Sequence, residues 1–133
     1  MSLYKYTVRT SRKQEFINLD HYIQDALEQS NVKSGLLTVF CPHTTAGITI
    51  NENADPDVKV DLELGLNKAF PNDPDYVHFE GNSDGHMKSS LIGASETLII
   101  ENSQPIFGTW QSVYFSEFDG PRNRTVYIKL IEG

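Results

Sequence analysis

The sequence predicts an α+β domain: a two-sheet β-sandwich of about seven strands with two main helices and a short third one. Several short segments alternate apolar and polar residues with the period of two that is typical of strands. Other segments repeat apolar residues at helical spacing, and turns rich in proline, glycine, asparagine and aspartate separate the elements. Because 133 residues without a linker or internal repeat suit one core, we expect a single domain over residues 1–133.

The first third is expected to contain a β-hairpin and a helix. Residues 3–10 and 15–19 alternate like strands, and the polar residues 11–14 between them favour a turn. Asp20 stands where a helix cap is expected, and the helix should run to about Gln29.

Two strands are expected next. An apolar run over residues 36–40 should end at Pro42, because proline cannot donate a hydrogen bond to a sheet. A second strand is expected over residues 45–52. The junction between the two strands places His43 and its neighbours at a strand end, which is a suitable place for a site.

A long helix should follow the second strand. Asp55 supplies a capping carboxylate and Pro56 a proline for the first helical position. The helix should reach Ala69, with Leu62 and Leu66 in the stripe that faces the core.

A polar loop and a short helix come next. The loop, residues 71–86, is long enough to be functional. The short helix is expected over residues 86–92, capped by Asp84 and stopped by Gly93.

The C-terminal third is expected to be all strand, over residues 96–101, 106–118 and 124–131. In the long middle strand, Trp110 and Tyr114 fall on one face. They indicate either an apolar contact between subunits or burial in the core of the monomer.

Composition narrows the classes of partner. The net charge of −7 disfavours nonspecific binding to nucleic acid or to an anionic membrane. The sequence contains no apolar run of membrane-spanning length. Its first ten residues lack the basic start and long apolar run of a signal peptide, so we expect none. One cysteine agrees with a reducing compartment, so we expect a cytoplasmic protein without membrane or nucleic-acid partners.

Three histidines are the first candidates for chemistry. His43, His78 and His86, with a carboxylate nearby, are the residue types of a catalytic site for a divalent metal such as zinc. The alternative is that each is a separate, hydrogen-bonded histidine, since no short metal-binding motif is present. The hydroxyl and ammonium groups suited to a phosphate are those of Thr44, Thr45, Lys88, Ser89 and Ser90.

Glu52 is a second kind of candidate. It ends the apolar row of Ile48 and Ile50 on one strand face, and an unpaired charge is costly to bury. It is therefore expected to be paired, bound to metal or part of the site. The alternative is a carboxylate in water at the rim of the fold.

Longer motifs extend over nearly the whole chain: HTTA at 43–46, NENADP at 51–56, EGN at 80–82, HMKSSL at 86–91, GTWQ at 108–111 and EFDGPR at 117–122. Together these motifs resemble the YjbQ-like family. The resemblance implies a compact β-sandwich with helices and a homotrimer. It also implies a weak secondary thiamine-phosphate synthase activity, which joins a pyrimidine diphosphate to a thiazole phosphate and releases pyrophosphate.

From the resemblance, we expect His43, His78 and His86 to be metal or substrate ligands, and we expect further site residues around them. The residues expected in catalysis are His43, Glu52, Lys88, Glu117 and Arg122. Those expected to bind substrate are Thr44, Thr45, Ser89, Ser90, Thr109, Gln111 and Asp119.

Two other functions fit the same residues. One is a metal-dependent hydrolase or lyase of another small phosphate ester. The other is a noncatalytic trimer that binds a small ligand or a metal.

Overall fold

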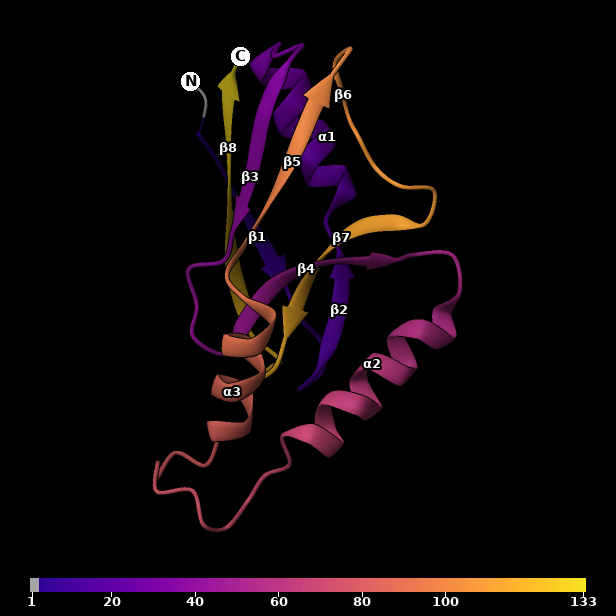
Figure 1. Ribbon diagram of the computed structural model, residues 1–133. Coiled ribbons are helices and arrows are strands. Elements are labelled where there is room, and N and C mark those ends of the chain that lie inside the picture. Colours follow the sequence, from indigo (N-terminus) through magenta and orange to yellow (C-terminus); the bar gives the residue numbers. More distant parts are fainter. Residues whose placement is uncertain (1–2) are drawn as a thin grey trace.

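The strand segments pair into two separate antiparallel sheets in the computed structural model, which describes residues 3–133 (Figure 1). In chain order the elements are β1 (Leu3–Arg9), β2 (Glu15–Asn18), α1 (Asp20–Ser30), β3 (Gly35–Phe40), β4 (Ala46–Glu52), α2 (Pro56–Ala69), α3 (Ser83–Ile92), β5 (Ser95–Glu101), β6 (Gln104–Pro105), β7 (Gln111–Glu117) and β8 (Asn123–Glu132).

The larger sheet has the strand order β1-β8-β3-β5-β6 and the smaller sheet has the order β2-β7-β4. Their inner faces and α1 enclose the main core, in which Leu37, Ile48, Phe115 and Ile128 are fully buried. Burying each such side chain contributes about 1.5 to 3 kcal/mol. The predicted α+β sandwich is therefore confirmed, with the two-residue β6 as an additional strand.

The hairpin predicted over residues 3–19 does not form. β1 pairs with β8 in the larger sheet, whereas β2 pairs with β7 in the smaller one. The turn between them carries the chain from one sheet to the other, and the Glu15 carboxylate accepts the backbone N–H groups of Ser11 and Arg12 there. β3 and β4 are likewise in different sheets. An alternating pattern identifies a strand but does not specify its partner.

The long strand predicted over residues 106–118 is shorter, because a turn precedes it. The Gln111 N–H donates to the Gly108 carbonyl, and the Gln111 side-chain oxygen accepts the Gly108 N–H. β7 therefore begins at Gln111. Trp110 lies in the turn and is 59% exposed, whereas Tyr114 is buried in the monomer.

Two helix caps differ from the sequence prediction. Asp20 is the first residue of α1, and its carboxylate accepts the Ser112 hydroxyl and the Val113 N–H instead of capping. α3 begins at Ser83, so Asp84 is the second residue of the helix and not its cap. The Asp84 side chain is buried, and its carboxylate forms ion pairs with Lys13 and Lys88. The cap of α2 is confirmed, since the Asp55 carboxylate accepts the Asp57 N–H.

α2 covers the outer face of the smaller sheet. There Leu66 joins a second apolar cluster with Phe16, Tyr114 and Phe118. Leu62 is only partly buried. Within residues 3–133, no helix is long and apolar enough to cross a membrane.

The two faces of α2 give a stability prediction. Leu66→Ala should lower the free energy of unfolding by about 2 kcal/mol or more, because it leaves a cavity between helix and sheet. Leu64→Ala, at a position that is 51% exposed on the same helix, should change it by less than about 0.5 kcal/mol. Urea denaturation of both variants measures the difference, and equal losses would contradict the packing of α2.

Candidate functional site

A polar cleft opens at one end of the smaller sheet. The pairing of Ala46 with Glu117 brings the start of β4 beside the end of β7. Three connections therefore meet there: β3 to β4, α2 to α3, and β7 to β8. The cleft has a volume of about 300 Å³ and is lined by Thr44, Thr45, His78, Glu80, Asn82, His86, Asp119, Arg122 and Arg124.

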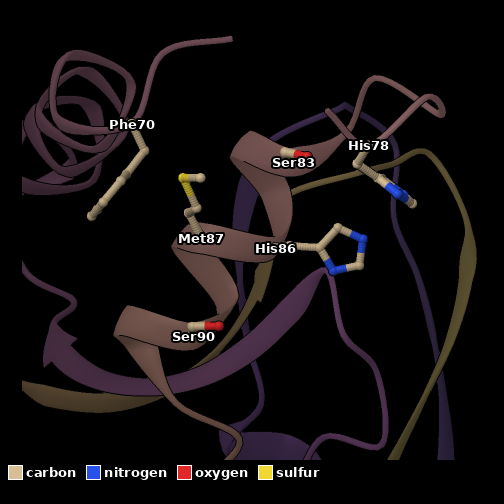
Figure 2. A pocket seen from close by; sticks show the side chains of 6 residues that line it. All are labelled: Phe70, His78, Ser83, His86, Met87 and Ser90. Atoms are coloured by element: carbon tan, nitrogen blue, oxygen red, sulfur yellow. The ribbon is translucent and has the colours of Figure 1, made fainter. Parts of the chain in front are cut away.

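His78 and His86 form a close pair in this cleft. Their ring centroids are 5.5 Å apart and the rings are nearly perpendicular. His86 projects from the first turn of α3, and His78 comes from the loop that precedes the helix (Figure 2).

Both histidines also line a second cavity of about 530 Å³, together with Phe70, Ser83, Met87 and Ser90 (Figure 2). The histidine pair is therefore shared by a polar cleft and a more apolar cavity.

His43 does not join the pair. Its Nε2 atom accepts the Thr125 N–H at 2.9 Å, so Nδ1 carries the proton in the neutral ring. Burial, followed by the nearby Arg124, lowers the pKa of His43. The side chain thus stabilises the junction of β3 with β8 instead of facing the cleft.

The predicted three-histidine cluster is therefore not formed. Among residues 3–133, no group of three or more histidine, cysteine, aspartate or glutamate side chains is arranged to hold a metal ion. The residues of this chain do not by themselves fit a site of three protein ligands. The divalent metal stays a prediction of the sequence. Cys41 is also buried, and burial raises the pKa of its thiol to about 11, which disfavours the nucleophilic thiolate form.

A buried ion pair borders the cleft through Arg124. Glu117 is fully buried, and Arg124, which lines the cleft, is 5% exposed. The Arg124 Nε donates to Glu117 Oε1 at 2.9 Å, and Nη2 donates to the Thr45 hydroxyl at 2.9 Å. Glu117 also accepts the Thr10 hydroxyl at 2.7 Å and the N–H of Phe118 and Asp119 at 3.1 Å each.

Arg124 is a residue of the cleft that sequence reasoning missed. The alternating pattern of this strand could have identified it, because Arg124 shares the inward face with Val126 and Ile128. Glu117 was expected in catalysis, but the structure surrounds its carboxylate with donors, which suits it to holding Arg124 in place.

A second acidic side chain organises the rim of the cleft. The Asp119 carboxylate accepts the Asn82 amide and the Arg122 Nη2, each at 2.9 Å. Arg122 Nε also donates to the Asp119 carbonyl at 2.7 Å. The Arg122 side chain is half exposed, and Thr44 and Thr45 border the same space.

Lys88 and Ser89 are not among the residues that line the cleft. Lys88 is buried, and its ammonium donates to Gln14 Oε1 at 2.7 Å and to Asn67 Oδ1 at 2.6 Å. Burial lowers the pKa of Lys88, and nearby Asp84 opposes this. The Ser89 hydroxyl donates to the Ala46 carbonyl at 2.6 Å. These contacts tie α3 to the turn before β2, to α2 and to β4.

Glu52, Thr109 and Gln111 lie at the other end of the smaller sheet. Glu52 pairs with Gln111 in the β4–β7 register, six residues along β4 from Ala46. At about 3.3 Å per residue, this places Glu52 about 20 Å from the cleft. Its carboxylate accepts the Asp55 N–H at 3.3 Å, beside the start of α2. Glu52 is therefore not close to His43, because β4 begins just after His43 and carries Glu52 to the opposite end of the smaller sheet.

Comparison with known proteins identifies the family. The family model described as "UPF0047 protein YjbQ-like" matches residues 4–133. The chain belongs to the YjbQ/UPF0047 family. Among relatives, UPF0047 protein MJ1081 of Methanocaldococcus jannaschii is 50% identical over 129 residues, with 97% of this chain and 94% of that protein covered. UPF0047 protein YugU of Bacillus subtilis is 48% identical, with 93% and 95% covered.

Solved structures agree with this assignment. An uncharacterised conserved protein of the YjbQ/UPF0047 family from Clostridium acetobutylicum superposes with a TM-score of 0.94 at 52% identity, covering 96% of this chain and 99% of that one. A hypothetical protein from Aeropyrum pernix has a TM-score of 0.94 at 29% identity, with both chains fully covered. The resemblance of the motifs to the YjbQ family is therefore confirmed.

The buried ion pair gives a second stability prediction. Glu117→Gln should lower the free energy of unfolding by about 3 to 5 kcal/mol, because it leaves Arg124 buried without a compensating charge. Glu52→Gln, at the far end of the same sheet, should change it by less than about 0.5 kcal/mol. Chemical denaturation measures both. A larger loss of unfolding free energy for Glu52→Gln than for Glu117→Gln would contradict this prediction.

His43 gives a prediction about pH. Because the folded state lowers its pKa below the ordinary value of about 6.5, the unfolded chain binds a proton first as pH falls. The stability that His43 contributes is complete above about pH 6.5 and is lost as pH falls toward the folded-state pKa. His43→Gln keeps an acceptor for the Thr125 N–H and should reduce the loss of stability between pH 7 and 5.

Urea denaturation at several pH values measures this effect. His21→Gln, at an exposed histidine of α1, is the matched control and should keep the wild-type pH dependence. The same pH dependence in His43→Gln and in the wild type would contradict the assignment.

Proposed function

We propose that this protein is an enzyme that joins two small substrates, at least one of them phosphorylated, at the His78–His86 pair. The observation that carries the proposal is the position of this pair between two cavities of different lining. Two neighbouring spaces with proton-transfer groups between them suit a reaction in which one bound molecule attacks another.

The polar cleft suits the substrate that loses its diphosphate group. Arg122 is half exposed and presents guanidinium N–H groups at the rim, and Thr44 offers a hydroxyl there. Asn82 Oδ1 is buried and has no hydrogen-bond partner among the described residues, so it is available to an amino group of a ligand.

The second cavity suits a ring with a polar substituent. Phe70 and Met87 provide apolar contacts, and the Ser83 and Ser90 side chains lie near them (Figure 2). A thiazole phosphate has this combination of an aromatic ring and an anionic tail. A pyrimidine diphosphate would then occupy the polar cleft.

The reaction that fits these positions is that of a thiamine-phosphate synthase. The thiazole nitrogen forms a bond to the methylene carbon of the pyrimidine, and the bond from that carbon to the diphosphate oxygen breaks. Pyrophosphate leaves with the electron pair of the broken bond. Arg122 would stabilise the departing anion, and an imidazole of the pair would give it a proton.

A hydrolase or lyase of a single phosphate ester is the second candidate. The volume of the polar cleft, about 300 Å³, is at the lower end for small-molecule sites and favours one small ester. Both candidates use the same imidazoles, and the hydrolase or lyase was expected from the sequence to depend on a metal. Metal analysis of protein purified without added metal tests whether a divalent ion binds.

We also propose that the protein is a cytoplasmic homotrimer. Tyr114 cannot support this, because its ring is buried in the monomer. Better support comes from the outer face of the larger sheet, where Leu36, Phe40, Ile99 and Ile131 are 44 to 61% exposed. An apolar surface of this kind marks a contact between proteins.

Enzyme assays test the proposed function. Purified protein supplied with the pyrimidine diphosphate and the thiazole phosphate should release pyrophosphate and form thiamine phosphate. His86→Asn should lower kcat/KM by about 100-fold or more, as expected for loss of a general acid–base group. His21→Asn should not lower it, because His21 is exposed on α1.

The other substrates distinguish the alternatives. Phosphate release from simple phosphate esters, without thiamine phosphate formation, would support the second candidate. Inactivity with every substrate, combined with tight binding of a phosphorylated ligand, would contradict an enzyme and favour a binding protein.

A further inference from the structure

The loop between α2 and α3, residues 71–82, exposes two large apolar side chains beside the site. Val77 is 98% exposed and Phe79 is 94% exposed, and they flank His78 on both sides. A single exposed apolar residue needs no explanation. Two apolar residues that are almost fully exposed, on either side of a histidine of the site, indicate a surface that contacts another molecule.

Three backbone N–H groups in residues 75–81 make local hydrogen bonds. The Tyr76 N–H donates to the Asp73 carbonyl at 3.2 Å, and the Gly81 N–H donates to the His78 carbonyl at 3.3 Å. The Asp75 N–H donates to the Asp73 side chain at 2.8 Å. These turns shape the loop but do not attach it to the sheets.

A complementary surface lies elsewhere on the molecule. A hollow of about 620 Å³ on the outer face of the larger sheet is lined mainly by Leu3, Phe40, Tyr127, Lys129 and Ile131. Leu3 and Ile131 lie near the two ends of the chain, and Figure 1 shows the loop at the opposite end of the molecule. The loop therefore cannot fill the hollow of its own chain.

We propose that the loop of one copy of this chain docks in the hollow of a second copy. Charge favours this occupant. The loop carries Asp73, Asp75 and Glu80 and contains no lysine or arginine. The hollow contains Lys129 and no acidic side chain among the residues that line it. An acidic, apolar loop thus meets a basic, apolar hollow.

The contact has a consequence for the architecture of the assembly. The loop and the hollow are different surfaces, so each copy can offer the loop to one neighbour and the hollow to another. Such head-to-tail contacts close into a ring when the rotation between copies permits it.

The contact also bears on the site, and this part rests on the proposed function. The docked loop carries His78, which lines both cavities beside His86. A neighbour that holds Val77 and Phe79 would hold His78 between them. The site would therefore reach its full rigidity only in the assembly.

Light scattering of the full-length protein tests the contact without using activity. The wild type should have a mass that is a multiple of the 15.0 kDa chain. Val77→Ser combined with Phe79→Ser should weaken the assembly at least 10-fold in dissociation constant. The matched control combines Ile106→Ser with Trp110→Ser, two residues that are also more than half exposed, and should keep the wild-type mass.

Charge reversal identifies the surface that receives the loop. Glu80→Lys and Lys129→Glu should each weaken the assembly, and the two changes together should restore at least part of it. Glu28→Lys and Lys33→Glu make the same charge changes at exposed positions outside the loop and the hollow, and should have no effect. Circular dichroism confirms that each variant is folded.

Three results would overturn the contact: a monomeric wild type, dissociation by the control pair but not by the loop pair, or no restoration in the reversed double variant. Hydrogen exchange adds a local measurement, in which the amides of residues 77–80 should exchange more slowly in the assembly. If the mass results agree but the assays for the proposed function fail, the contact stands and the reaction is wrong.

Discussion

The buried pair of Glu117 and Arg124 is the interaction on which the arrangement of the cleft depends. Glu117 lies at the end of β7 in the smaller sheet, and Arg124 lies at the start of β8 in the larger one. The pair therefore links the two sheets where they meet. Thr10, just after β1, and Thr45, just before β4, form hydrogen bonds with the pair through their hydroxyl groups. Because an unpaired charge cannot stay buried, these segments must converge for either residue to be accommodated.

The strands and helices could largely be predicted from the sequence, because each depends on local patterns. α2 has its capping aspartate and its proline where they were expected. The pairing of strands could not be predicted in the same way. Residues 3–10 and 15–19 alternate equally well as a hairpin or as strands of two sheets, and only the packing of the whole chain decides between them.

The candidate site could be predicted in part. His78 and His86 form a pair, since they are close in sequence and one short helix carries the second of them. His43 has the same residue type, but the Thr125 N–H binds its free nitrogen. Lys88 was expected to bind phosphate and to act in catalysis, yet its ammonium donates to Gln14 and Asn67 in the interior. Residue type indicates what a side chain can do, and long-range packing decides what it contacts.

The arginines of the cleft are already engaged by acidic residues of the same chain. Glu117 balances Arg124, and Asp119 balances Arg122, in a protein whose net charge is −7. The cleft is therefore not a strongly positive basin that gathers any anion from a distance. Discrimination among ligands must come from the fixed directions of N–H and hydroxyl groups at short range, so the shape of a ligand matters more than its total charge. The net charge of −7 also disfavours the approach of long polyanions.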